Sequence, residues 1–379
     1  MTEDFNPAPY MRWAKFRHQA RYDLTGSNLV PCDSRDAPGL LDDLPLTGPG
    51  PDGYPPLFEA IAHRYGVDPS GIALATGCSG ANFLVCAALL RAGDEVLVEH
   101  PVYDPLPAAA RIVGARVVHF ERCFEDRWSV DPDRVARAMT RHTRLVIISS
   151  PHNPTGVIVP PDVIRALGEL AERHDAWLLV DEVYRDATYG RDLRSSTPAH
   201  TRAPAHKSGA EEALSSAHAH PRCIVTNSLT KSYGLPGLRC GWAMGEAEVI
   251  ERIRRTRDAV DAVGSYPAEV ASARAFAMIE GLAARARAII EPNFDRLTEF
   301  MESRNDLAWV RPDGGTVAFP RLLGSSDAES FVDRLLHDHE TAVVPGRFFG
   351  AASHFRIAFG VKPDTLEHGL EAIARVLGR

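Results

Sequence analysis

The sequence predicts an α/β protein in two parts: a large domain with a mostly parallel sheet between two layers of helices (α/β/α), and a smaller α+β domain. The 379 residues are more than a single core usually holds. Between residues 71 and 227, nearly continuous apolar segments alternate with helical ones, a pattern typical of parallel strands buried on both faces. After residue 302 this alternation stops, which indicates a second unit.

The chain begins with a segment of little periodicity. Residues 1–45 carry several prolines and one apolar-aromatic stretch at residues 10–16, so we interpret them as an irregular arm that packs on the rest. Residues 55–65 have helical spacing and begin with proline, which the first turn of a helix tolerates. Residues 71–75 are predicted as a strand that runs into a glycine-rich turn and a helix at residues 81–91.

The alternation that follows defines the large domain. The next strands are predicted at residues 95–99, 116–120, 145–149, 176–181 and 223–227, with helices at residues 105–113, 131–139 and 161–174. The large domain is therefore predicted at residues 46–285. Ligands of such sheets bind beyond the carboxyl ends of the strands.

One stretch interrupts this pattern. Residues 192–220 are rich in Ala, Ser, Pro and His and have no clear period, so we predict an exposed, mobile insertion. Four histidines lie in it, His200, His206, His218 and His220. Their spacing matches no zinc pattern and no cysteine joins them, so no metal site is predicted.

The C-terminal part has a different order. Residues 267–302 are predicted to be helical, and broken or bent near Pro292. Strands are expected at residues 308–311, 316–322, 342–345 and 355–359, and helices at residues 328–339 and from residue 364 onward. Residues 286–379 and the arm at residues 1–45 form the predicted small domain.

Composition excludes several classes of partner. The net charge of −8 and the lack of a dense basic face argue against nucleic-acid binding, and too few residues precede the large domain for a regulator's DNA-binding domain. No apolar run is long enough to span a membrane, and the N-terminus does not resemble a signal peptide. The six cysteines show no paired spacing. We therefore expect a reduced, cytoplasmic protein.

A lysine in a Gly/Pro-punctuated turn is the strongest chemical signal. Lys231 lies in the sequence SLTKSYGLPGLRCGW, with Ser228 three residues before it and Arg239 eight residues after it. A lysine held in an apolar turn favours the neutral amine, which a Schiff-base nucleophile needs, and a hydroxyl with a guanidinium suits a phosphate. Read alone, the segment also fits a surface lysine followed by a buried arginine.

Other candidate groups follow the predicted strands. Asp181 ends an apolar strand, where a carboxylate is costly without a cationic partner, although it could instead cap the next helix. Tyr184 lies three residues later. The turns PHNPTG, with Asn153, and TGCSGA each follow a strand, and the second opens a helix as an anion site would. Tyr103 offers an aromatic face or ordinary core packing.

Taken together, these motifs resemble those of the class I/II aminotransferases, pyridoxal 5'-phosphate (PLP) enzymes of fold type I. The resemblance rests on SLTKSYGLPGLRCGW, PHNPTG, VDEVYRD, TGCSGA, the PDGG turn and FRIAFG in the family's order, from about residue 22 to the C-terminus. Lys231 would then form a Schiff base with PLP and shuttle a proton, and Asp181 would pair with the ring nitrogen. Asn153 and Tyr184 would bind the phenolic oxygen, and Tyr103 would stack on the ring.

The resemblance also implies a phosphate site and a substrate site. The phosphate would be held by Cys78, Ser79, Gly80, Ser228 and Arg239. Arg356, in FRIAFG, would bind the substrate α-carboxylate bidentately, with Asn153 beside it. The arm at residues 24–28 would bring either Gly26 or Ser27 to the substrate. The family also often has cis bonds where His100–Pro101 and Asn153–Pro154 fall, and its active sites lie at a homodimer interface.

Three departures from the family bear on the reaction. Gly48 and Phe58 stand where the family usually has a tyrosine and an arginine. Residues 263–267 lack the arginine that dicarboxylate-specific members carry, which argues against aspartate or glutamate as preferred substrate. We predict an aminotransferase acting on an amino acid and a 2-oxo acid. A lyase or cyclase of the same fold, similar to capreomycidine synthase and acting on an arginine-type amino acid, stays open.

Overall fold

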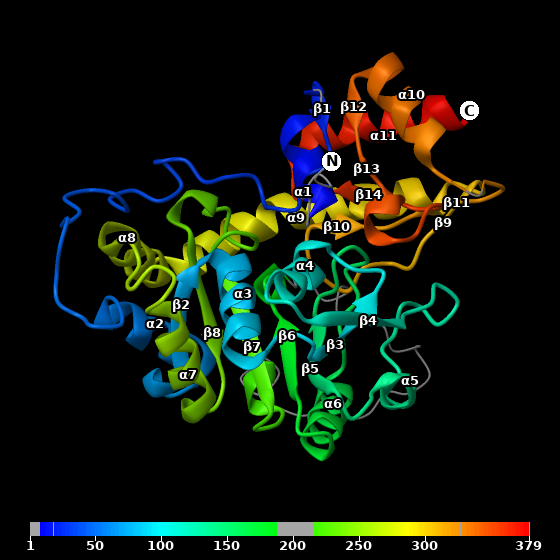
Figure 1. Ribbon diagram of the computed structural model, residues 1–379. Helices are drawn as coiled ribbons and strands as arrows, with labels where there is room; N and C mark the ends of the chain where they lie inside the picture. Colours follow the sequence, from blue (N-terminus) through cyan, green and yellow to red (C-terminus); the bar gives the residue numbers. More distant parts are fainter. Residues whose placement is uncertain (1–7, 18, 188–214, 326, 379) are drawn as a thin grey trace, which may run out of the picture.

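The structure is a computed structural model that describes residues 8–17, 19–187, 215–325 and 327–378. Figure 1 shows a large sheet with its helices in the lower part of the molecule and a smaller group of strands and helices above it. The long helix α9 (Ile279–Glu302) runs from one part toward the other.

Seven strands form the large sheet in the order β2-β8-β7-β6-β5-β3-β4. They are β2 (Ile72–Thr76), β3 (Glu95–His100), β4 (Arg116–Glu121), β5 (Thr143–Ser149), β6 (Trp177–Asp181), β7 (Cys223–Ser228) and β8 (Cys240–Met244). Every pairing is parallel except those of β8, which runs antiparallel to both β2 and β7. The prediction of a mostly parallel α/β sheet is confirmed.

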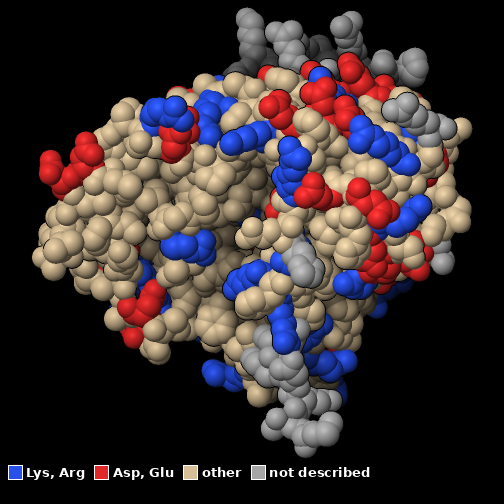
Figure 2. All heavy atoms as spheres, turned by 90° about the horizontal axis from the view of Figure 1, so that it is seen from above, with Lys and Arg blue, Asp and Glu red and all other residues tan. Residues whose placement is uncertain are grey.

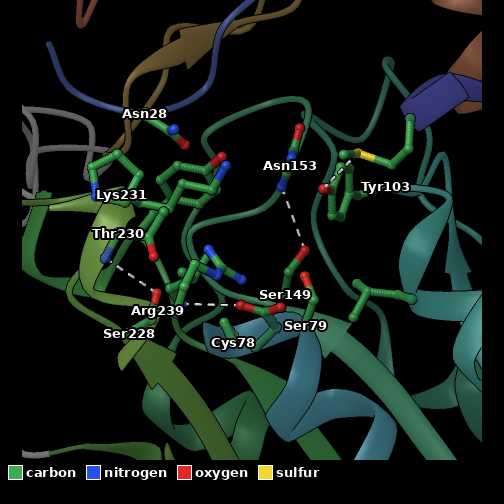
Figure 3. Close-up of a pocket in the computed structure, with 16 residues that line it drawn as sticks. Asn28, Cys78, Ser79, Tyr103, Ser149, Asn153, Ser228, Thr230, Lys231 and Arg239 are labelled. Carbon is green, nitrogen blue, oxygen red and sulfur yellow. Dashed lines mark hydrogen bonds between the residues drawn. The ribbon is translucent and has the colours of Figure 1, made fainter. Parts of the chain in front are cut away.

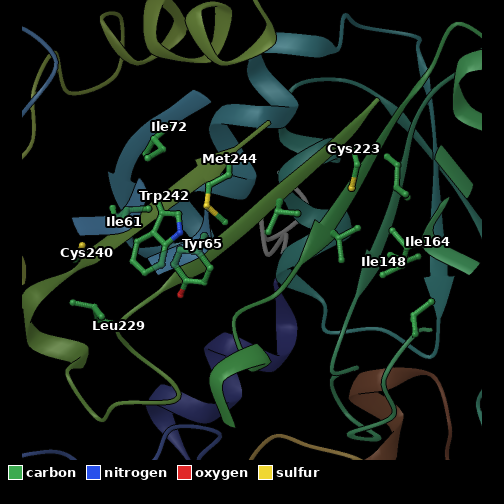
Figure 4. Close-up of a cluster of buried hydrophobic side chains, with 14 of the residues drawn as sticks. Ile61, Tyr65, Ile72, Ile148, Ile164, Cys223, Leu229, Cys240, Trp242 and Met244 are labelled. Carbon is green, nitrogen blue, oxygen red and sulfur yellow. The ribbon is translucent and has the colours of Figure 1, made fainter. Parts of the chain in front are cut away.

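Helices cover both faces of this sheet. They are α2 (Pro55–Tyr65), α3 (Gly77–Leu89), α4 (Pro105–Ile112), α5 (Pro132–Ala138), α6 (Pro161–Arg173), α7 (Ala247–Arg257) and α8 (Tyr266–Ala277). Alternate residues of each strand face opposite layers. In β5, for example, Leu145 and Ile147 join the cluster under α3, α4 and α7, whereas Val146 and Ile148 join the one under α2, α5, α6 and α8. Figure 4 shows part of the second cluster, with Trp242 next to Tyr65.

The smaller part has a separate apolar core. Its helices are α9, α10 (Glu329–His339) and α11 (Pro363–Leu377). Its strands are β1 (Tyr22–Asp23), β9 (Leu307–Ala308), β10 (Val317–Ala318), β11 (Arg321–Leu322), β12 (Thr341–Ala342), β13 (Val344–Pro345) and β14 (Phe355–Ala358). β1 pairs with β12, so the part of the N-terminal arm at Tyr22–Asp23 is hydrogen-bonded to a strand of the smaller part.

Helix α9 belongs to both cores. Its first turns place Ile279, Leu282 and Ala283 in the cluster of the large sheet. From Ala286 onward its buried residues, among them Ile290, pack in the cluster of the smaller part. The division into a large domain (residues 46–285) and a small domain (residues 1–45 and 286–379) stays a prediction. Its boundary between residues 285 and 286 falls inside α9.

Several local predictions are wrong. Residues 10–16 are not irregular but lie in helix α1 (Pro9–Phe16), which alone would be too short to be stable and is held by tertiary contacts. The strand β8 and the helix α7 were not predicted. The helix at residues 267–302 is interrupted at Met278, whose backbone leaves the helical region (φ −103°, ψ 8°), and Pro292 is accommodated inside α9.

The predicted insertion lies mostly outside the described residues, which include only its last part. His200 and His206 are outside them. The described chain resumes at Ser215, and Ser215 and Ser216 both donate hydrogen bonds to the buried carboxylate of Glu182. His218 bonds to a backbone oxygen of α2, and no group of His, Cys, Asp and Glu in the described segments could hold a metal ion.

No helix within the described ranges is both long and apolar enough to cross a membrane.

Candidate active site

A cavity of about 240 Å³ opens where β5, β6 and β7 end and α3 begins. It is lined by Met11, Asn28, Cys78, Ser79, Tyr103, Leu106, Ser149, Asn153, Asp181, Val183, Tyr184, Ser228, Thr230, Lys231, Pro236 and Arg239. Figure 3 shows side chains from these distant segments converging on it. Of the residues predicted to contact a cofactor, all line the cavity except Gly80, which lies one position further along α3.

The Lys231 amine lies inside this cavity. Its Nζ donates a hydrogen bond to Ser27 Oγ at 2.8 Å and lies 5.9 Å from the centre of the Tyr184 ring. Burial, together with the positive charges of Arg356 and Arg239, lowers the pKa of Lys231 to about 8, against the opposing effect of Asp181. Part of the amine is therefore neutral near physiological pH, where an ordinary lysine amine is almost fully protonated.

Asp181 is the buried carboxylate of the cavity. It accepts hydrogen bonds from Asn82 Nδ2 at 2.8 Å and from the Val183 N–H at 3.0 Å. The amide oxygen of Asn82 in turn accepts from the Thr226 hydroxyl at 2.6 Å. Burial raises the pKa of Asp181, and these hydrogen bonds oppose the rise. Sequence reasoning missed Asn82 and Thr226, because an amide inside an apolar helix and a threonine inside an apolar strand carry no distinct signal.

One end of the cavity is suited to an anion. Gly77 has φ +73°, and a Cβ on it would lie 2.4 Å from Arg239 Nη2, so only glycine lets the guanidinium approach this turn. Arg239 also donates to the Thr76 carbonyl at 3.3 Å. Figure 3 shows Arg239, Ser228, Cys78 and Ser79 close together. The first-turn amides of α3 have no acceptor within their own helix, which adds donors there.

Asn153 lies on the opposite side, supported by a buried network that was not predicted. Its N–H donates to Ser149 Oγ at 3.4 Å, and the Ser149 hydroxyl donates to Glu99 Oε1 at 2.6 Å. Glu99 pairs with Arg122 at 2.7 Å, and both side chains are fully buried. In the sequence, only the acidic residues Glu95 and Glu99 at the two ends of the predicted strand at residues 95–99 could have indicated such a network. They did not indicate which cation they would pair with.

Arg356 is fully buried beside the cavity although it does not line it. It donates to Asn153 Oδ1 at 2.9 Å, to the Tyr10 hydroxyl at 2.6 Å and to the Thr25 carbonyl at 2.8 Å. It forms no ion pair with any Asp or Glu of the described residues. A buried guanidinium without an anion is costly, which indicates a site for an anionic ligand.

The arm places its two candidate residues differently. Ser27 is buried and bonds to Lys231, whereas Gly26 is exposed. Gly48 faces the ring of Tyr266, where a Cβ would come within 2.0 Å of the ring atoms, so the space of a side chain at position 48 is filled. The cis bond at His100–Pro101 is present, but the expected one at Asn153–Pro154 is wrong and the second cis bond is Ser150–Pro151.

Comparisons with known proteins agree with this geometry. The family model "Aminotransferase class I and II" matches residues 46–373. The aspartate/prephenate aminotransferase of Thermus thermophilus is 32% identical over 345 residues, covering 87% of this chain and 83% of that protein. Capreomycidine synthase of Streptomyces vinaceus is 32% identical over 394 residues, covering 98% of this chain and 94% of that protein. The structure of a PLP-dependent aminotransferase from Streptococcus suis aligns with a TM-score of 0.82 and 26% identity, over 94% of this chain and 93% of that one.

The family match spans both parts of the fold and every cavity-lining residue except Met11 and Asn28. The comparisons confirm the predicted family, the predicted enzyme class and the predicted cofactor, pyridoxal 5'-phosphate. The chain belongs to the class I and II aminotransferases.

Proposed function

We propose that the protein transfers an amino group between an amino acid, not preferentially aspartate or glutamate, and a 2-oxo acid, with Lys231 forming the Schiff base to PLP. The observation that carries this proposal is the juxtaposition in one cavity of an amine of lowered pKa, a buried carboxylate and an anion site. These are the three groups that the cofactor's aldehyde, ring nitrogen and phosphate require.

The residues fit the cofactor by their chemistry. Cys78, Ser79, Gly80, Ser228 and Arg239 would hold the phosphate at the end of the cavity that Gly77 keeps open. Asp181 would keep the ring nitrogen protonated, because a buried carboxylate gains most from a cationic partner. When bound, PLP supplies an electron sink that stabilises negative charge at the substrate Cα.

The remaining side chains act on the substrate and on proton movement. The neutral Lys231 amine would take the proton from Cα and return it elsewhere, as a general base of suitable pKa can. Asn153 and Tyr184 would hold the phenolic oxygen, and Tyr103 would lie against the ring face. Among the described residues that line the cavity, the only cations are Lys231 and Arg239. None is left for a second carboxylate, which supports a substrate other than aspartate or glutamate.

Arg356 would bind the substrate α-carboxylate. Its guanidinium is buried and hydrogen-bonded to Asn153, which lines the cavity. Ser27, bonded to Lys231, would lie near the substrate, and exposed Gly26 is the weaker candidate of the two.

We also propose a cytoplasmic homodimer. All six cysteines are free thiols. The loop before α2 and the segment after α7 expose large apolar side chains, Leu41, Leu46, Val260 and Val263. In Figure 2 the left half of the upper face, over that loop and α8, carries fewer charged side chains than the right half. A surface of this kind is suited to a second copy of the chain.

The proposed transfer is tested with the purified PLP-bound protein and single amino acids, arginine included, without any 2-oxo acid. We expect a suitable amino acid to convert the cofactor stoichiometrically to its amine form, which absorbs at shorter wavelength, and a 2-oxo acid to reverse the change. A set of amino acids that never yields the amine form would overturn the proposal.

A second function is favoured by one observation. Capreomycidine synthase aligns over 98% of this chain, against 87% for the Thermus aminotransferase. This supports a PLP-dependent lyase or cyclase acting at Cβ or Cγ of an arginine-type amino acid. In the same experiment, such an enzyme would restore the starting spectrum without a 2-oxo acid and release a new product.

The pH dependence of cofactor capture follows from the Lys231 pKa. Only the neutral amine attacks the aldehyde, and in the cofactor-free protein its fraction rises as pH rises toward about 8. We expect the rate of PLP capture to increase about tenfold per pH unit below this value and to become constant above it. Stopped-flow absorbance measures it. A rate still rising steeply between pH 9 and 10 would mean that the pKa is not lowered.

A further inference from the structure

Helix α1 closes the cavity next to Arg356. Met11 lines the cavity and accepts a hydrogen bond from the Tyr103 hydroxyl at 3.3 Å. Tyr10 is buried, and its hydroxyl lies 2.6 Å from Arg356 Nη2. Figure 1 shows α1 between the smaller part and α4 of the large part. The N-terminal arm thus reaches the guanidinium that the proposed function assigns to the substrate carboxylate.

The hydrogen bonds around Tyr10 leave one donor free. The hydroxyl oxygen accepts from Arg356, so its own proton is still available. Arg356 Nε is likewise buried and has no acceptor among the described residues. The Tyr10 hydroxyl and Arg356 Nε therefore each have an unused hydrogen-bond donor, and the guanidinium charge has no anionic partner among the described residues. A carboxylate could accept both hydrogen bonds and balance the charge.

We propose that Tyr10 is a further substrate-binding residue, whose hydroxyl donates a hydrogen bond to the α-carboxylate held by Arg356. This rests on the proposed role of Arg356. A carboxylate has lone pairs for both a guanidinium and a hydroxyl, and a bond from a neutral donor to an ionised acceptor is stronger than one between neutral groups. A neutral analogue without the carboxylate charge would gain little binding free energy from the hydrogen bond of the Tyr10 hydroxyl.

The position of the hydroxyl is fixed mainly by residues outside the helix, and Trp13 of the same helix adds one ring contact. The Tyr10 N–H donates to Asp104 Oδ2 at 2.8 Å, at the start of α4. The Tyr10 ring contacts the rings of Trp13, Tyr103, Phe348 and Phe349, with centroids 5.8 to 6.3 Å apart. An eight-residue helix is marginal alone, so these contacts hold α1 in place. Tyr10→Phe keeps the ring contacts and removes only the hydroxyl.

The same geometry has an opposite interpretation. The Tyr10 hydroxyl, by accepting a hydrogen bond from Arg356, would compete with the substrate carboxylate for the guanidinium. The two interpretations predict opposite changes in affinity. If Tyr10 donates to the carboxylate, its loss weakens carboxylate binding. If it only competes, its loss strengthens binding.

The test uses the PLP-bound protein and two probes, propanoate and its neutral isostere propanamide, which carry no amine to react. Dissociation constants come from ligand-observed NMR titrations. We expect Tyr10→Phe to weaken propanoate binding by about tenfold or more, because a hydrogen bond to a charged group is lost. Propanamide binding should change less than twofold. Tyr22→Phe, on β1 with its ring stacked on His368, is the matched control and should bind propanoate like the unsubstituted protein.

The variant Arg356→Gln tests the proposed role of Arg356 independently of the proposed role of Tyr10. If it weakens propanoate binding strongly while Tyr10→Phe changes it less than twofold, the Arg356 role stands and the Tyr10 proposal is overturned. Tighter binding by Tyr10→Phe also overturns it, in favour of competition. If Arg356→Gln leaves propanoate binding unchanged, the proposed carboxylate site itself is wrong.

Discussion

Replacing Lys231 with arginine is expected to lower turnover by at least about 1,000-fold, because a guanidinium stays protonated and can neither form a Schiff base nor accept the Cα proton. The substitution keeps the positive charge and the approximate length of the side chain. The variant should still take up PLP through its phosphate and ring contacts, but sodium borohydride should no longer fix the cofactor covalently to the protein. Mass spectrometry of the reduced protein measures this.

Lys362→Arg is the matched control. Lys362 directly precedes α11, is exposed and does not line the cavity, so the same chemical change should leave turnover and borohydride fixation unaltered. Turnover within tenfold of the unsubstituted protein in Lys231→Arg would contradict the proposed role, as would a borohydride-fixed cofactor on another residue.

Asp181→Asn is expected to lower kcat by about 100-fold or more with a much smaller change in KM. The amide can still accept from the Val183 N–H, but it carries no negative charge to keep the ring nitrogen protonated. The cofactor's electron sink would then be weakened, while substrate binding at the proposed Arg356 site would be unchanged. Steady-state kinetics with the responsive amino acid measure the two constants separately.

Asp175→Asn provides the control for this substitution. Asp175 precedes the same strand, β6, and its side chain is largely exposed, so the identical change should leave kcat unchanged. An Asp181→Asn variant with a raised KM and an unaltered kcat would mean that Asp181 binds substrate rather than tuning the cofactor.

The sequence predicted the cavity well because most of its residues follow parallel strands. Asp181 is the last residue of β6, and Asn153 and Lys231 come shortly after β5 and β7. Neighbouring parallel strands end at the same edge of a sheet. Their convergence therefore followed once the strands were recognised. The anion site was predictable for a similar reason, since Gly77–Leu89 begins where β2 ends.

Contacts between distant segments were not predictable in this way. Arg356 meets Tyr10 and Asn153, which lie 346 and 203 residues away in the sequence, and no local pattern encodes such a meeting. Helix α1 depends on these partners rather than on its own propensity. The strand β8 was missed because Gly241 weakens its strand signal, yet a Cβ there would come within 2.2 Å of Gly77, so the packing of the anion site requires the glycine.

The shared helix α9 has a consequence for folding. Each core lacks part of its lining unless this one continuous element is formed, since residues near Ile279 complete one core and residues near Ile290 complete the other. Loss of either core removes the support of the helix for its neighbour. We therefore expect the two parts to fold and unfold cooperatively, as one unit rather than as two independent domains.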